Sequence, residues 1–118
     1  MAYKIAIATT DDVHVNEHFG AASRIVIYWA EGNVWAVDEV IHFEDGKDHC
    51  TGQHNSAEIR LSAVSECEYI IASRIGSRIQ RYFEYQKQKF FEMPDAEVSM
   101  ILTKILKYQE RLIQRKEV

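Results

Sequence analysis

The sequence is poor in the residues that mark disordered or disulfide-rich chains. Its 118 residues include one proline, five glycines and two cysteines. So little proline and glycine argues against a disordered or low-complexity chain, and two cysteines cannot build a disulfide framework. A chain of this length can bury roughly two thirds of the surface that its unfolded form exposes. We therefore predict a single globular domain over residues 1–118.

Long hydrophobic runs and an excess of basic residues are missing as well. No apolar stretch approaches the roughly 20 residues that span a bilayer, and the first residues do not have the charge and hydrophobicity pattern of a signal peptide. The 14 basic and 18 acidic residues leave a net charge of −4, which provides no broad face for neutralising phosphates. We expect a cytoplasmic protein that binds neither membranes nor nucleic acids. Small ligands or other proteins are the expected partners.

Alternating and continuous apolar runs predict five β-strands. Residues 3–8 alternate large and small apolar side chains, which suits the central strand of a sheet that is covered on both faces. A glycine-containing turn at residues 31–33 joins the second and third strands in an antiparallel hairpin. The predicted strands are residues 3–8, 24–30, 34–43, 69–72 and 89–92.

Apolar positions spaced three and four residues apart predict three helices. The first runs over residues 57–67, after a polar segment at 44–55 that predicts a long exposed loop. The second follows Gly76, and the third follows Pro94 with Asp95 as its N-cap. The resulting order βββαβαβα predicts a three-layer α/β domain with a five-stranded mixed sheet, because a strand–helix–strand crossover makes parallel neighbours.

Polar and ionisable side chains are concentrated between the first two predicted strands, in residues 9–20. This stretch holds three carboxylates, a glycine at its end and two imidazoles four residues apart, His14 and His18. Ligands collect at such strand ends in α/β sheets, and an imidazole nitrogen suits iron, molybdenum or zinc. His18 is therefore a candidate metal ligand that His14 could assist. The alternative is that the His18 ring binds no metal and holds the turn by hydrogen bonds to loop carbonyls.

A second set of candidate metal ligands lies in the polar segment before the first helix. His49, Cys50 and His54 place a thiol and two imidazoles close together in the sequence. Thiolate and imidazole suit zinc or an iron–sulfur species, although a structural zinc site usually has four protein ligands. A polar loop without metal is the alternative. The other cysteine, Cys67, lies between a helix and an apolar strand and is expected to be a buried small side chain.

Two arginines lie at the predicted start of the second helix. Arg74 and Arg78 flank the dipeptide Gly76-Ser77. The free N–H groups and positive dipole end of a helix start attract anions, so both arginines are candidates for binding an anionic cluster. The alternative is that both are solvated surface side chains.

Two enzyme classes lack their required residues. A nuclease of the ribonuclease H type needs carboxylates in the first strand and near the end of the fourth, where they hold two metal ions. Residues 5–8 and 72–73 offer none. A nucleotide-binding oxidoreductase needs Gly-x-Gly-x-x-Gly after the first strand, and residues 9–12 do not match it.

Several segments, taken together, resemble the dinitrogenase iron-molybdenum cofactor biosynthesis family. The triplet His18-Phe19-Gly20, after a strand and an Asp-containing loop, is the best-defined element, and Gly76 matches the glycine turn. Many members have a small residue after the fourth strand where this chain has Arg74. The segments that carry the resemblance are residues 4–9, 15–22, 25–28 and 65–72, which follow the family's order over nearly the whole chain.

This resemblance implies a ribonuclease H-like fold with sheet order 3-2-1-4-5 and an antiparallel second strand. It also implies a non-catalytic carrier that binds an iron–sulfur or iron-molybdenum cluster through His18. The implied partners are metallocluster assembly proteins or apo-nitrogenase, and a homodimer is left open. Two other functions are also left open: an interaction module that binds no cluster, and a small metallohydrolase that uses the Cys50 and His54 loop.

Overall fold

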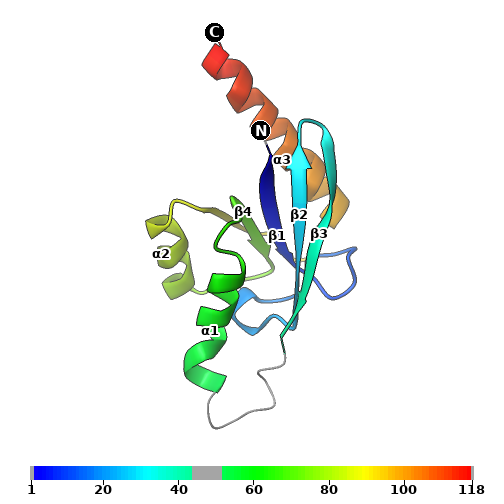
Figure 1. Ribbon diagram of the computed structural model, residues 1–118. Coiled ribbons are helices and arrows are strands. Elements are labelled where there is room, and N and C mark those ends of the chain that lie inside the picture. Colours follow the sequence, from blue (N-terminus) through cyan, green and yellow to red (C-terminus); the bar gives the residue numbers. More distant parts are fainter. Residues whose placement is uncertain (1, 44–51, 118) are drawn as a thin grey trace.

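The computed structural model describes residues 2–43 and 52–117, with side chains over residues 2–43 and 57–112. These residues form a mixed sheet with helices on both faces (Figure 1). The strands are β1 (Tyr3–Ala8), β2 (Arg24–Glu31), β3 (Val34–His42), β4 (Tyr69–Ala72) and β5 (Lys89–Glu92). The helices are the 3₁₀ turn η1 (Phe19–Ala21), α1 (Gly52–Ala63), α2 (Ser77–Tyr85) and α3 (Val98–Glu117). The predicted order βββαβαβα is confirmed, with η1 as an addition.

The strand order confirms that β1 is the middle of the five-stranded sheet. The order is β3-β2-β1-β4-β5. β2 pairs antiparallel with β1 and β3, whereas β4 pairs parallel with β1 and β5. This is the ribonuclease H-like order and direction that the family resemblance implies. β3 and β5 are the two edge strands.

The alternation of side chains in β1 divides the core into two layers. Ile5 and Ile7 belong to the layer beneath α3, and Ala6 and Ala8 belong to the layer beneath α1 and α2. All four side chains are buried, and burying each isoleucine contributes roughly 1.5–3 kcal/mol. The small alanines leave room for two helices to lie on one face, while the isoleucines fill the space under a single helix (Figure 1).

Two helix starts differ from the sequence prediction. α1 begins at Gly52, five residues before the predicted start at residue 57. Residues 52–56 are helical, but they have no periodic apolar side chains from which a helix could be predicted. α3 begins at Val98, and Asp95 has a φ of +63°, whereas an N-cap has extended backbone. The N–H of Asp95 donates to the carbonyl of Val15 at 2.9 Å. This bond holds the segment against the loop of residues 9–20, the predicted ligand loop, and the helix starts only after it. The remainder of the predicted loop, residues 44–51, lies outside the described residues.

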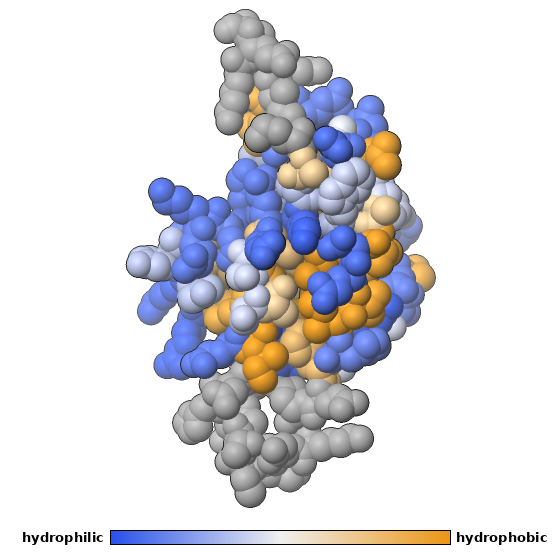
Figure 2. All heavy atoms as spheres, viewed as in Figure 1, coloured by the Kyte–Doolittle hydropathy of each residue, from blue (hydrophilic) through white to orange (hydrophobic). Residues whose placement is uncertain are grey.

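Hydrophobic side chains reach the surface where helices do not cover the sheet. Figure 2, drawn from the same side as Figure 1, shows hydrophobic atoms between polar ones over β1, β2 and β3. On the edge strand β3, Val34 and Val37 are both exposed. Within the described ranges, no helix combines the length and the apolar character needed to cross a membrane.

Candidate functional site

The predicted ligand loop lies at the carboxyl end of β1, and its turn is joined to the residues that follow β4. The N–H of Phe19 donates to the carbonyl of Arg74, and the N–H of Ser73 donates to the carbonyl of Glu17, each at 2.9 Å. These two bonds form an isolated parallel bridge between His18 and Arg74. β1 and β4 run parallel, so their carboxyl ends lie at the same edge of the sheet. The structure therefore brings together two of the predicted site residues.

Buried neighbours hold the turn on both sides of His18. Phe19 is only 1% exposed, and its ring packs edge-on against Phe83 of α2, with ring centres 5.3 Å apart. On the other side of η1, the guanidinium of Arg60 donates from Nε to the carbonyl of Ala22 at 2.9 Å. Arg60 is itself 2% exposed and is therefore part of the core that supports the loop. His18 itself is exposed, so its backbone is fixed while its ring faces solvent.

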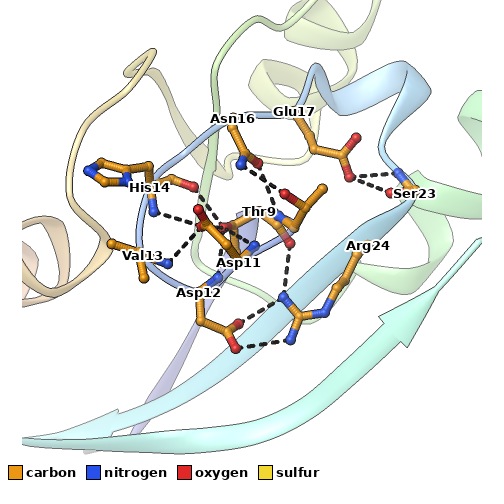
Figure 3. A network of polar contacts seen from close by, with 10 residues as sticks. Thr9, Asp11, Asp12, Val13, His14, Asn16, Glu17, Ser23 and Arg24 are labelled. Carbon is orange, nitrogen blue, oxygen red and sulfur yellow. Dashed lines mark hydrogen bonds and ion pairs between the residues drawn. The ribbon is translucent and has the colours of Figure 1, made fainter.

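A hydrogen-bonded network closes the first half of the loop (Figure 3). The hydroxyl of Thr9, a fully buried residue, donates to the carbonyl of His14 at 2.7 Å. One carboxylate oxygen of Asp11 accepts the N–H groups of Val13 and His14 at 2.9 and 3.0 Å. The bonds from His14 and Val13 lower the pKa of Asp11, because they stabilise the charged carboxylate. The Asp11 carboxylate is therefore already hydrogen-bonded to the backbone of its own loop.

The other two loop carboxylates are also engaged by the protein. Asp12 forms a two-pronged ion pair with Arg24, with N–O distances of 2.8 and 3.1 Å (Figure 3). Arg24 also donates to the carbonyl of Thr9 at 3.0 Å. Glu17 accepts both the N–H and the hydroxyl of Ser23, at 2.9 and 2.7 Å. The three carboxylates thus hold the loop in shape, which argues against an all-carboxylate metal site.

The two imidazoles of the loop face different parts of the fold. His14 is bridged to Glu97 just before α3, whereas His18 is bridged to Arg74 after β4. Both histidines are exposed, and the His18 ring makes no hydrogen bond to any residue that the structure describes. Over the described part of the chain, no group of three or more His, Cys, Asp or Glu side chains is arranged to hold a metal ion. Among the described residues, His18 is therefore an exposed imidazole that belongs to no multi-ligand metal group.

The two predicted arginines border the start of α2. Gly76 is the N-cap of this helix, and no side chain caps its first amides. Arg74 precedes the cap, Arg78 lies in the first turn, and both side chains are exposed. Glu92 of β5 accepts the N–H of Ile75 at 2.8 Å and so fixes the turn between Arg74 and the helix. The site edge therefore combines one imidazole, two guanidinium groups and uncapped helix amides.

The other predicted metal ligands are not placed with His18. His49 and Cys50 lie outside the described residues, and His54 belongs to α1 but its side chain is also outside them. Cys67 is 3% exposed, as expected, and burial raises the pKa of its thiol to about 12. The Cys67 thiol is therefore not a candidate ligand.

Sequence reasoning missed the supporting residues of the loop. The Asp11 turn has a local signal, because Asp side chains often accept N–H groups two and three residues further on. Arg60 has no such signal, since its contact with Ala22 depends on how α1 packs against η1.

A family model described as "Dinitrogenase iron-molybdenum cofactor" matches residues 1–108 of this sequence. The chain belongs to this family. Two curated relatives, both named Protein NifX, come from Klebsiella pneumoniae and Sinorhizobium fredii, and each is 30% identical, over 78 and 80 residues respectively. The matches cover 66% and 64% of this chain but 48% and 49% of the relatives. The chain therefore spans about half the length of the curated relatives it matches.

Solved structures share the fold of this chain. The crystal structure of PH0822 has a TM-score of 0.63 and 17% identity, over 88% of this chain and 89% of the other. The NMR structure of a putative dinitrogenase, MJ0327 from Methanococcus jannaschii, has a TM-score of 0.58 and 16% identity, over 92% and 91%. At these identities the likeness shows the fold alone, and it confirms the expected three-layer α/β architecture.

Proposed function

We propose that this chain is a non-catalytic carrier of an iron–sulfur or iron-molybdenum cluster, or of its precursor, in nitrogenase-type metallocluster assembly. Membership of the dinitrogenase iron-molybdenum cofactor family supports the class of cargo. The single observation that carries the proposal is the exposed His18 ring beside Arg74, on a turn whose backbone is fixed by buried neighbours. A fixed turn presents the imidazole in one place, and exposure lets a large cargo approach and leave.

A single protein ligand suits a preassembled cluster better than a single metal ion. A zinc ion needs three or four protein ligands, whereas a cluster brings its own sulfides and needs only to be held. His18 would bind one metal atom of the cargo through a ring nitrogen. The lack of further described ligands around His18 is consistent with weak and reversible binding, which a carrier requires.

The charges at the site edge favour an anionic cargo. Thiolate-ligated clusters and organic acid ligands carry negative charge, and Arg74 and Arg78 supply two exposed positive charges. The uncapped amides at the start of α2 add the positive end of a helix dipole. We expect this combination to attract the cargo, while His18 decides where it is held.

The proposal extends to partners and location. Metallocluster assembly proteins would supply the cluster and apo-nitrogenase or another assembly protein would receive it, in the cytoplasm. The same fold could instead serve as an interaction module that binds no cluster.

Anaerobic reconstitution tests the proposal. The protein would be incubated with a preformed iron–sulfur cluster, desalted, and measured for iron content and for visible cluster absorption. We expect the natural sequence to retain the cluster and His18→Ala to lose most of it. His14→Ala is the matched control, because it removes an exposed imidazole from the same loop. Equal retention by both variants would contradict a role for His18, and no uptake by the natural sequence would favour the interaction module.

A further inference from the structure

One face of the edge strand β5 is not covered by any described helix. Lys89 and Phe91 pair with Tyr69 and Ile71 of β4, which face α3, so they point to the α3 side of the sheet. On this side, α3 packs over β1, β2 and β4. Phe91 is consequently 40% exposed, although it is a large aromatic residue in a sheet.

The opposite face of the same strand is covered. Phe90 packs beneath α2, with its ring centre 5.9 Å from that of Phe83. Two described helices, α1 and α2, lie on this side of the sheet, whereas α3 lies alone on the other side (Figure 1). The α3 layer is therefore one helix narrower than the sheet beneath it.

A groove of about 280 Å³ occupies the uncovered area. Its floor is formed by the sheet and by the residues just beyond β5, and its wall is one side of α3. The wall positions are spaced as one helix face, so they present a continuous surface. The lining residues are Tyr69, Phe91 and Met93 on the floor and Ile101, Lys104, Ile105 and Tyr108 on the wall.

The rim of this groove is basic, although the whole chain has a net charge of −4. Lys104 lines the wall and is exposed. The ammonium group of Lys89 lies 5.3 Å from the ring centre of Tyr69 and 5.7 Å from that of Tyr108. Glu92, the acidic residue of β5, instead binds the N–H of Ile75. The groove therefore joins an apolar floor to positively charged edges.

We propose that this groove binds an amphipathic helix of a partner protein, with carboxylates bordering the apolar face of that helix. A helix beside α3 would complete the layer at the usual separation of 8–10 Å between packed helices. Its apolar side chains would cover Phe91 and Met93, and its carboxylates would meet Lys89 and Lys104.

The charges argue against α2 or α3 of a second copy of this chain as the occupant. The exposed sides of α2 and α3 carry more basic than acidic residues. These are Arg78 and Arg81 against Glu84 on α2, and Lys104, Lys107 and Arg111 against Glu110 on the described part of α3. Either helix would bring like charges against Lys104, which is unfavourable at an interface. An acidic helix from a different protein has the complementary charge.

The groove also lies close to the candidate site without covering it. The N–H of Met93, at one end of the groove, donates to the carbonyl of Ala72 at 2.9 Å, two residues before Arg74. A partner seated in the groove would therefore be near the edge that bears His18. The inference itself rests on the groove and does not require that a cluster is bound.

A pair of synthetic helical peptides tests the proposal with the whole chain. Each would have about 18 residues, roughly 27 Å as a helix, with leucines on one face. In one peptide glutamates border the leucines, and in the other lysines take their places. Fluorescence anisotropy should show at least about tenfold tighter binding of the glutamate peptide, a difference that shrinks at high salt. Amide shifts in NMR spectra should map the glutamate peptide to β5 and α3.

Variants distinguish specific binding in the groove from non-specific binding elsewhere on the surface. Phe91→Ser should weaken binding of the glutamate peptide by about tenfold. Lys104→Glu should weaken binding of the glutamate peptide and strengthen binding of the lysine peptide. Misfolding cannot produce such a gain in binding. Tyr85→Ser is the control, since Tyr85 is an 82% exposed aromatic residue of α2 outside the groove. Equal binding of both peptides, shifts that map elsewhere, or a dimer whose contacts map to the groove would each overturn the proposal.

Discussion

His18 and Arg74 lie side by side because the backbone on either side of them is hydrogen-bonded. The N–H of Phe19 reaches the carbonyl of Arg74, and the N–H of Ser73 reaches the carbonyl of Glu17. The bridge pairs the loop that follows β1 with the residues that follow β4, so an imidazole and a guanidinium share one edge of the sheet.

Arg74→Ala should weaken cluster binding by several-fold without abolishing it. The guanidinium attracts an anionic cargo through charge, and exposed charges at a surface contribute modestly and are screened by salt. Binding would be measured at low and at high ionic strength. Arg81→Ala is the matched control, because Arg81 is an exposed arginine of α2 that does not take part in the bridge to His18. If Arg81→Ala has the same effect as Arg74→Ala, binding depends on the overall positive charge and not on the position of Arg74 beside His18.

Removing the ring of Phe19 should cost about 3–5 kcal/mol of unfolding free energy, the usual range for truncating a buried phenylalanine. Phe19 is buried against Phe83, and the cavity left by its removal would lie directly under the His18 turn. Denaturant unfolding of Phe19→Ala measures the loss. Tyr85→Ala provides a comparison, since truncating that exposed ring should change stability by less than about 0.5 kcal/mol. A similar loss in both variants would contradict this account of the turn.

Replacing Arg60 should loosen the turn after His18 even where the fold survives. Its guanidinium donates to the Ala22 carbonyl, and the removal of a buried donor leaves that acceptor unsatisfied. In Arg60→Met we expect faster amide hydrogen exchange at residues 19–22 than in the natural sequence. Amides of β2 should keep their protection. Unchanged exchange at the turn would contradict a role for Arg60 in holding it.

Asp11 should make part of the stability depend on pH. Its pKa is lowered in the folded protein by the N–H groups of His14 and Val13. The stability that it contributes is therefore present above the unfolded-state pKa of about 3.9 and is lost as pH falls through the lower folded-state pKa. Thermal unfolding of Asp11→Asn should show a weaker dependence on pH below about pH 4 than the natural sequence. Glu84→Gln, at an exposed position of α2, is the control and should keep the natural slope.

Cys67 should be unreactive while the protein is folded. Burial raises the pKa of its thiol to about 12, and the thiolate is the reactive form. In a Cys50→Ser background, where Cys67 is the remaining cysteine of the 118 residues, we expect no alkylation by iodoacetamide at pH 8. Full alkylation should follow on unfolding in denaturant. Rapid labelling of the folded protein would show that the surrounding core opens often.

Local sequence patterns predicted the elements that depend on the burial of their own side chains. The alternation of large and small residues in β1 placed it in the middle of the sheet, and the apolar stripe of α3 identified a helix lying on one face. Where no apolar periodicity marks a segment, the prediction was incomplete. Residues 52–56 carry no periodic apolar side chains, so the true start of α1 at Gly52 left no signal.

A local motif can also be overruled by a distant contact. Pro followed by Asp is a common helix start, yet Asp95 adopts a φ of +63° and α3 begins only at Val98. The hydrogen bond from Asp95 to the Val15 carbonyl comes from a different part of the chain. It sets the backbone where local preference alone would start a helix.

The sequence by itself determined the five strands, the central position of β1, and the polar side chains available at its end, because these follow from the spacing of apolar residues along the chain. Only the tertiary structure decided that His18 lies beside Arg74, that other groups of the protein bind the loop carboxylates, and that no described helix covers one face of β5. These properties depend on which distant segments meet and on where each hydrogen bond points, and residue spacing carries no record of either.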